Sequence, residues 1–266
     1  MASSFSGKWA WITGASSGIG RGLALELARR GASLILSSRN REKLEELCRE
    51  TGLEEARCLV VPLDVSDTAS VAKAAKKVLD RVPRIDYLFN NAGVSQRGLI
   101  RETSLEVDRR IMEINYFGAI ALTKAVLPRM IEQGGGHIVV TSSIVGKFGF
   151  PLRSAYSASK HALHGFFETL LVEEKKSGIA VTLLVPGHIV TDVSINALTA
   201  TGERYGKMDP GQARGMSVEK AVRKILRGVE KKKREVVVGK IDAWSVYLKK
   251  YFPGLFFRLA GRVSPI

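Results

Sequence analysis

The sequence predicts one α/β domain, in which helices cover both faces of a doubly wound parallel sheet of seven strands. Apolar segments of strand length alternate along the chain with longer segments of helical periodicity, which is typical of a parallel sheet. No stretch rich in proline or glycine divides the 266 residues, and 45% of them are hydrophobic, enough for one large core. In such a sheet, ligands bind at the carboxyl ends of the strands.

Each element of this fold has a candidate segment, and strands and helices alternate in order. The predicted strands are residues 8–13, 33–38, 58–62, 86–90, 137–142, 179–185 and 235–238. The predicted helices are residues 18–30, a charged helix from Arg41, and residues 67–82, 105–132, 154–177 and 218–232. This alternation places a single domain at residues 1–240, followed by an amphipathic C-terminal extension at residues 241–266.

A glycine-rich loop follows the first predicted strand. Its sequence, TGASSGIG, places Gly14, Gly18 and Gly20 between a strand and a helix. Glycines let the backbone approach a pyrophosphate, while the free N–H groups and positive dipole end of the helix attract the anion. Ser16 and Ser17 can add hydroxyl donors. A tight turn that binds nothing is the alternative, but the strand–loop–helix context favours a dinucleotide site of the Rossmann type.

The end of the second predicted strand favours NADP(H) over NAD(H). Sites for NAD place an acidic residue here, which accepts hydrogen bonds from the ribose hydroxyls. This chain has Ser38, Arg39 and Asn40 instead, and the planar guanidinium of Arg39 suits a 2′-phosphate. The alternative is that Arg39 only begins the charged helix. Asp64 and Val65, after the third strand, either contact the adenine or only lead into the next helix.

Residues that suit carbonyl chemistry follow the fifth strand. Tyr156 and Lys160 lie one helical turn apart on the same face, and Ser143 follows residues 137–142. Hydride transfer from a nicotinamide to a carbonyl needs a proton donor for the oxygen, and the reverse reaction needs a base. A tyrosine can serve if its pKa falls toward neutral, and both the Lys160 ammonium and a nicotinamide cation favour the phenolate. Ser143 would hold the substrate oxygen by a hydrogen bond.

These motifs together resemble those of the short-chain dehydrogenase/reductase family. The resemblance covers about residues 8–240 and includes the loop TGxxxGxG, the sequence NNAG at residues 90–93, Ser143, the YxxxK motif and the pair Pro186-Gly187. It implies that Tyr156 is the general acid and base and that Ser143 orients the substrate. It also implies that Lys160 binds the nicotinamide ribose and adjusts the pKa of the tyrosine.

Further positions are assigned through this resemblance. Asn115 would hold a water that links Lys160 to solvent, although the pattern alone indicates an asparagine that bonds locally within a helix. Ile189 would meet the nicotinamide carboxamide, and Thr191 a phosphate or the amide. The expected cofactor site is Gly14, Ser16, Ser17, Gly18, Ile19, Gly20, Ser38, Arg39, Asn40, Asp64, Val65, Asn91, Ala92, Gly93, Tyr156, Lys160, Pro186, Gly187, Ile189 and Thr191, with no metal.

Residues 191–216 are expected to form a lid over the substrate. The lid offers apolar contacts through Val193, Ile195, Ala197 and Leu198, and cationic ones through Arg204, Lys207 and Arg214; Phe148, Phe150, Pro151 and Leu152 would add an apolar wall. These residues predict a carbonyl on a hydrophobic skeleton, with ordinary packing as the alternative for each of them.

The C-terminal extension is amphipathic and basic. Residues Trp244, Tyr247, Leu248, Tyr251, Leu255 and Leu259 recur at helical spacing, with Lys249 and Lys250 opposite and Pro253 as an interruption. From residue 201 onward, 16 Lys and Arg against 6 Asp and Glu give +10 of the net charge of +15. Such a segment suits a lid or a subunit contact, which we favour, or an anionic membrane surface. We expect no nucleic-acid partner, because no binding module accompanies the basic residues.

The segments VPGHIVTDVSINALTATGERYGKMD and PGLFF narrow the resemblance to the dehydrogenase/reductase family member seven subgroup, related to hydroxysteroid dehydrogenases. The resemblance implies an NADP(H)-dependent oxidoreductase for a steroid-, retinoid- or lipid-like carbonyl or secondary alcohol. It also implies a homodimer or homotetramer that pairs through residues 105–132 and 154–177. One alternative is a 3-oxoacyl thioester reductase served by an acidic carrier protein. Another is a non-catalytic NADP-binding scaffold, against which the complete Ser143, Tyr156 and Lys160 set argues.

Composition gives expectations about the compartment. The N-terminus lacks a basic start followed by an apolar core, so we expect no secretory signal. Cys48 and Cys58 have no metal or redox spacing, which predicts free, partly buried thiols in a reducing compartment. We therefore expect a cytoplasmic protein, with peripheral membrane contact as the alternative.

Overall fold

The computed structural model describes residues 4–262, and it confirms the predicted sheet. Its strands are β1 (Trp9–Thr13), β2 (Ser33–Ser37), β3 (Cys58–Val60), β4 (Tyr87–Asn90), β6 (Gly136–Thr141), β7 (Ile179–Pro186) and β9 (Glu235–Val238). They run parallel in the order β3-β2-β1-β4-β6-β7-β9. The order reverses between β1 and β4, which is where a doubly wound sheet binds its ligand.

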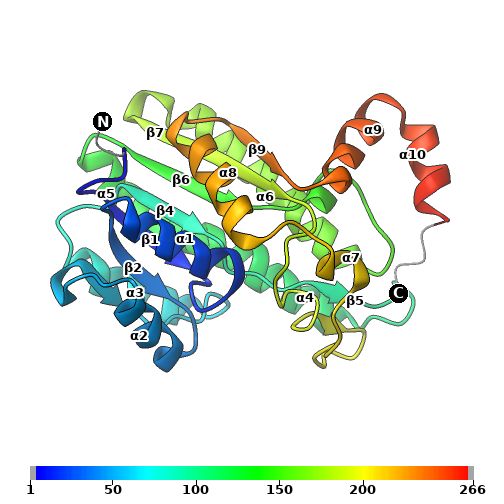
Figure 1. Cartoon of the computed structure of the whole chain (residues 1–266), viewed down its shortest axis with the longest axis horizontal. Helices are drawn as coiled ribbons and strands as arrows, with labels where there is room; N and C mark the ends of the chain where they lie inside the picture. The colour runs from blue at the N-terminus through cyan, green and yellow to red at the C-terminus, as the bar shows by residue number, and fades with distance from the viewer. Residues whose placement is uncertain (1–3, 263–266) are drawn as a thin grey trace.

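Helices cover both faces of this sheet (Figure 1). They are α1 (Gly18–Arg29), α2 (Arg41–Glu50), α3 (Thr68–Leu79), α4 (Leu105–Met112), α5 (Gly118–Glu132), α6 (Ser154–Glu173) and α8 (Val218–Glu230). Buried side chains of α1, α2 and α8 form one core, and those of α3, α5 and α6 form a second. Successive strand residues point to opposite faces, so that Ile12 enters the first core and Trp11 the second.

The predicted helix at residues 105–132 is interrupted, and the prediction of one continuous helix is wrong. A π-helical turn (Glu113–Phe117) separates α4 from α5 and carries the buried Asn115. The Asn115 side chain accepts a hydrogen bond from Val94 N at 2.8 Å and donates to Val94 O at 2.9 Å. It also donates to Ser159 Oγ at 3.0 Å. The turn thus places an amide against another segment, which hydrophobic periodicity does not register.

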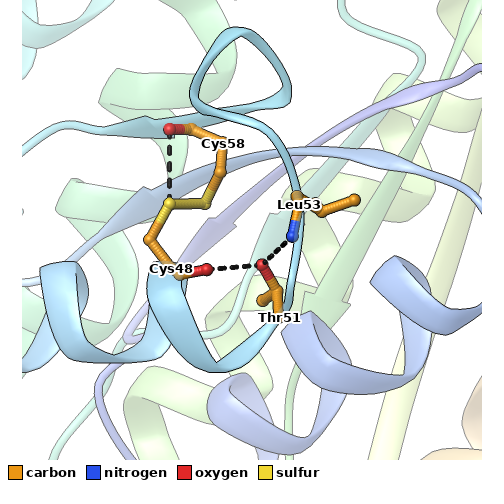
Figure 2. Close-up of a disulfide and its surroundings, with 4 residues drawn as sticks. All are labelled: Cys48, Thr51, Leu53 and Cys58. Carbon is orange, nitrogen blue, oxygen red and sulfur yellow. Dashed lines mark hydrogen bonds between the residues drawn. A yellow bond between two sulfur atoms is a disulfide. The ribbon is translucent and has the colours of Figure 1, made fainter.

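Cys48 and Cys58 form a disulfide, so the prediction of free thiols is wrong (Figure 2). Cys48 lies in α2 and Cys58 begins β3, with their Cα atoms 6.0 Å apart, a separation that a disulfide spans. Thr51 Oγ1 holds the intervening turn by donating to Cys48 O at 2.6 Å and accepting from Leu53 N at 3.3 Å. The spacing of the two cysteines carried no sign of this chain reversal.

Two short segments complete the fold around the carboxyl ends of the strands. β5 (Gln96–Arg97) pairs with β8 (Leu198–Thr199), a small sheet that the sequence did not predict and that ties the lid segment to the domain. After β9 the tail forms a 3-10 turn (Ile241–Trp244), α9 (Ser245–Tyr251) and α10 (Pro253–Ala260). Both tail helices project at one end of the sheet (Figure 1). The predicted interruption at Pro253 is confirmed.

Candidate active site

A cavity of about 730 Å³ opens at the carboxyl ends of the strands and collects residues from every predicted motif. Of the residues predicted from the sequence, it is lined by Gly14, Ser16, Ser17, Gly18, Ile19, Ser38, Arg39, Asn40, Asp64, Val65, Asn91, Ala92, Gly93, Ser143, Tyr156, Lys160, Pro186, Gly187, Ile189 and Thr191. Gly20 and Asn115 do not line it. They lie behind the wall, where Gly20 packs on Gly14 and Asn115 on Gly93.

The glycine loop has the shape that a pyrophosphate site needs. Gly14 and Gly18 have φ values of +64° and +52°, in the left-handed region that favours glycine. A Cβ on Gly20 would lie 2.2 Å from Gly14 O, so only glycine fits there. No side chain caps the N-terminus of α1, whose first residues, Gly18 and Ile19, line the cavity. An anion can take the place of a cap, so the loop fits a dinucleotide phosphate.

Thr13 joins the ends of β1 and β4 beside this loop. Its hydroxyl accepts hydrogen bonds from Asn91 N and Ala92 N, both at 3.0 Å, and Asn91 Nδ2 donates to Thr13 O at 3.1 Å. Thr141, at the end of β6, donates to Asn91 Oδ1 at 3.2 Å. These bonds hold the NNAG segment between three strand ends, where it lines the cavity.

The part of the cavity beside the end of β2 combines predicted and unpredicted residues. Arg39 is exposed and lines the cavity with Lys43, a second cation that the sequence reading missed. Asn40 both lines the cavity and caps α2, because its side chain accepts from Lys43 N at 2.8 Å. Asp64 lines the cavity and also accepts hydrogen bonds from Ser66 in the turn before α3, as expected of a helix entry; its contact with the adenine stays a prediction.

Ser143, Tyr156 and Lys160 line the same cavity as the glycine loop. Lys160 Nζ donates to Thr141 O at 2.7 Å and lies 5.8 Å from the centroid of the Tyr156 ring. Burial lowers the pKa of Lys160 to about 8. The Ser143 hydroxyl accepts from Val145 N at 3.3 Å and donates to Pro186 O at 3.4 Å. It lines the cavity and forms a hydrogen bond with Tyr156.

Two buried arginines act on Tyr156, and neither was marked by the sequence. Burial raises the pKa of Tyr156 above its ordinary value, and a hydrogen bond with Ser143 opposes this rise. The charges of Arg153 and Arg97 oppose it further. The expectation of a pKa near neutral therefore fails for the protein by itself, because burial outweighs the groups that favour the phenolate.

The two arginines share one carboxylate of the lid. Arg97 Nε and Arg153 Nη2 donate to Asp209 Oδ2 at 3.0 and 3.1 Å, and Arg97 also donates to Ser95 Oγ at 2.9 Å. All three charged side chains are at most 10% exposed. Burial lowers the pKa of Arg153 to about 10, with a further decrease from Arg97. The cluster ties the lid to β5 and to the start of α6.

The rest of the cavity wall comes from the lid segment (residues 191–216), the predicted apolar wall and the tail. Among the predicted contacts, Val193, Arg204, Phe148 and Phe150 line the cavity, whereas Ile195, Ala197, Leu198, Lys207, Arg214, Pro151 and Leu152 do not. Unpredicted lining residues are Ser95, Arg97, Arg153, His188, Asn196, Gln212, Asp242, Ser245 and Phe256. Most of these residues are isolated polar side chains, which look like ordinary solvated surface in a sequence. Phe256 differs, because it lies in α10 and reaches the cavity only through the packing of the tail.

Within residues 4–262, no group of His, Cys, Asp or Glu side chains is arranged to hold a metal ion. In the same described part of the chain, no helix is both long and apolar enough to cross a membrane.

Known proteins match this sequence along most of its length, and they belong to the family that its motifs resemble. The sequence model of a family described as short chain dehydrogenase matches residues 8–201. The dehydrogenase/reductase SDR family member 7B of Mus musculus is 46% identical over 253 residues, which are 93% of this chain and 78% of that protein. A dehydrogenase/reductase SDR family protein 7-like of Drosophila melanogaster is 40% identical over 256 residues, 94% of this chain and 78% of its own length.

Solved structures with the same architecture include one in complex with NAD and one complexed with 5-hydroxy-NADP. A short-chain dehydrogenase of Streptomyces avermitilis superposes with a TM-score of 0.81 at 31% identity, covering 96% of each chain. A Burkholderia phymatum relative in complex with NAD gives 0.83 at 25% identity, over 98% of this chain and 97% of its own. An alcohol dehydrogenase of Thermococcus sibiricus complexed with 5-hydroxy-NADP gives 0.74 at 29%, over 88% and 97%.

Proposed function

Since this chain belongs to the short-chain dehydrogenase/reductase family of oxidoreductases, we propose that it transfers a hydride between NADP(H) and a hydrophobic carbonyl or secondary alcohol. The observation that carries the proposal is the meeting of Ser143, Tyr156 and Lys160 in one cavity with the glycine loop. The catalytic roles are proposed from the family resemblance, and this geometry and the chemistry of the side chains support them.

The bound nicotinamide supplies or accepts the hydride, and the residues of this chain supply position and proton transfer. Tyr156 donates its phenolic proton to the carbonyl oxygen during reduction and accepts the alcohol proton during oxidation. The Ser143 hydroxyl donates a hydrogen bond to the same oxygen and fixes it beside the tyrosine. Lys160, 5.8 Å from the Tyr156 ring, binds the ribose and places a cation near the phenolate when it is protonated.

The choice of NADP(H) is supported by Arg39 and Lys43, because both cations line the end of the cavity where a 2′-phosphate would lie. Replacing Arg39 by alanine is expected to raise the KM for NADPH about 10- to 100-fold, from the loss of a charged hydrogen bond. The KM for NADH should change little. Initial rates at varied cofactor concentration measure both.

Arg41→Ala is the matched control for this substitution. Arg41 stands two residues further on, makes a surface ion pair with Glu45 at 3.3 Å and does not line the cavity. The control should leave both KM values unchanged. An equal rise for NADH and NADPH in Arg39→Ala would contradict the assignment of the 2′-phosphate to Arg39.

The hydrophobic substrate class is supported by the apolar wall of Phe148, Phe150, Val193 and Phe256. We expect NADPH-dependent reduction of hydrophobic ketones, measured across a panel of steroid-, retinoid- and lipid-like compounds. A 3-oxoacyl thioester belongs in the same panel as the alternative substrate. Tight NADPH binding without turnover of any compound would favour the non-catalytic scaffold instead.

Removing the charge of Arg153 is expected to shift the pH dependence of alcohol oxidation upward. Oxidation needs Tyr156 as a base, and Arg153 favours its ionised form. In Arg153→Leu the rise of kcat with pH should therefore move up by about one unit, while Arg97, Asp209 and Lys160 stay in place. The measurement is the pH profile of kcat.

Two comparisons separate this electrostatic effect from a merely structural one. Arg153→Lys keeps the charge and should restore most of the original pH profile. Arg101→Leu removes an arginine whose side chain is 80% exposed and should not move the profile. A profile that stays unchanged in Arg153→Leu would show that the arginine does not act on the tyrosine.

We further propose a homodimer or homotetramer in the cytoplasm. The oligomer is supported by apolar side chains exposed along the helices expected to pair, Leu105, Phe117 and Val172 among them. Light scattering of the purified chain tests the assembly. The location stays a prediction from the sequence, and the disulfide of Cys48 and Cys58 removes the argument from free thiols in a reducing compartment. Cell fractionation tests it.

A further inference from the structure

The inner side of the tail belongs to the wall of the active site. Val246 and Phe256 are buried, and the Phe256 ring lies 4.7 Å from that of Phe148. Asp242 accepts hydrogen bonds from the backbone N–H of His188 and from its Nδ1 at 3.1 Å, in the loop that would meet the nicotinamide. Burial acts to raise the pKa of Asp242, but the bonds from His188 outweigh it and hold the pKa below its ordinary value.

The outer side of the tail is an exposed apolar face. Of the sixteen large hydrophobic side chains exposed in the described chain, eight fall between residues 241 and 259. Trp244, Tyr247 and Tyr251 recur at helical spacing and are 70, 46 and 63% exposed, while Leu255 and Leu259 continue the face on α10. A soluble monomer rarely gathers this much apolar surface, so the tail face is an interaction surface.

The charges around this face select its partner. Between residues 240 and 262 the tail carries the cations Lys240, Lys249, Lys250, Arg258 and Arg262. Lys240 donates a hydrogen bond to Arg214 O at 2.7 Å, whereas Lys250 Nζ lies 5.1 Å from the centroid of the exposed Tyr251 ring, beside the apolar face and not opposite it as the sequence predicted. Its only acid in that range is Asp242, which His188 holds on the inner side. A second copy of the same face would oppose positive charge with positive charge, whereas anionic lipid headgroups would complement it. Aromatic side chains beside lysine and arginine are also typical of proteins that lie at a membrane interface.

The position of the tail connects this face to the substrate. Asp242, Ser245 and Phe256 line the cavity from the tail, and the two tail helices project at one end of the molecule (Figure 1). We propose that the outer face of the tail docks on an anionic membrane surface, where the cavity receives its hydrophobic substrate directly from the lipid. The delivery of a hydrophobic substrate from the lipid rests on the proposed function, whereas the docking itself does not.

Vesicle flotation of the full chain tests the docking. We expect the protein to float with phosphatidylcholine vesicles that contain phosphatidylserine, to float much less with phosphatidylcholine alone, and to be released by high salt. Replacing Lys249 and Lys250 by glutamate should lower the bound fraction at least about tenfold, since each basic residue near the surface contributes to binding. The control replaces Lys175 and Lys176, an equally basic exposed pair after α6, by glutamate and should bind normally.

Two results would overturn the docking. One is that the unaltered protein fails to float with anionic vesicles. The other is that the Lys249 and Lys250 pair changes the oligomer mass in light scattering while vesicle binding persists, which would make this face a subunit contact.

Turnover distinguishes failure of the docking from failure of the proposed function. With a water-soluble ketone, the Lys249→Glu/Lys250→Glu variant should keep the original kcat. With a ketone embedded in anionic vesicles, its rate should fall by the factor lost in flotation. Equal rates of both proteins on the embedded ketone would contradict delivery through the tail. If neither protein turned over any ketone, the proposed function would be contradicted. Vesicle flotation would still show whether the tail docks on the membrane.

Discussion

Tyr156→Phe is expected to lower kcat by about a hundredfold to ten-thousandfold, the range that a positioned acid or base contributes. The phenylalanine ring keeps the packing at the start of α6 but has no proton to give to the carbonyl oxygen. Cofactor binding should be retained, because the glycine loop and Lys160 are unchanged. Steady-state rates measure kcat, and NADPH fluorescence titration measures the affinity.

Tyr116→Phe is the matched control for this loss. Tyr116 lies in the π-helical turn, and its ring contacts Phe117 and Phe166 outside the cavity. Its loss of a hydroxyl should leave kcat near the original value. If Tyr156→Phe also kept the original kcat, Tyr156 would not be the residue that transfers the proton.

The second large effect is a gain of stability. Lys160 is almost fully buried, and its pKa falls from 10.5 to about 8, which costs the folded protein about 3 kcal/mol at pH 7. Lys160→Met removes this cost but also the hydrogen bond to Thr141 O, a contact of about 1 kcal/mol. The cofactor-free variant should therefore be about 2 kcal/mol more stable at pH 7, and it should be inactive. Urea unfolding measures the difference.

The pH dependence of this gain has a definite sign. Between pH 8 and 10.5 the unfolded chain still binds the Lys160 proton, whereas the folded protein has released it. The unaltered protein therefore becomes more stable relative to the variant as the pH rises through this window. The variant's advantage should shrink above pH 8 by about 1.4 kcal/mol per pH unit, vanish at about pH 9.5, and turn into a deficit of about 1 kcal/mol by pH 10.5, where only the lost hydrogen bond remains. An advantage that is constant with pH, or that also appears in the exposed Lys224→Met control, would show that desolvation of Lys160 is not its cause.

The features that could be predicted from the sequence are those set by residues close together in the chain. The strands and the glycine loop follow from hydrophobic runs and from backbone conformations that only glycine adopts, so Gly14 and Gly18 were visible without a structure. The cluster of Arg97, Arg153 and Asp209 was invisible because its members lie 56 and 112 residues apart and each resembles a solvated charge. The disulfide of Cys48 and Cys58 depended in the same way on a chain reversal.

The π-helical turn at Glu113–Phe117 also limits how the length of the chain can vary. A π turn holds about one residue more than an α turn, so deleting a single residue there would favour one continuous α-helix. Because the wider turn absorbs the extra residue, α4 and α5 would keep nearly their present faces toward the cores, with Ile111 and Leu122 still buried. The deletion would instead displace Asn115, whose amide bonds Val94 N, Val94 O and Ser159 Oγ from the π turn. A one-residue gap at this point would therefore spare both cores and cost the anchor of the segment that follows NNAG.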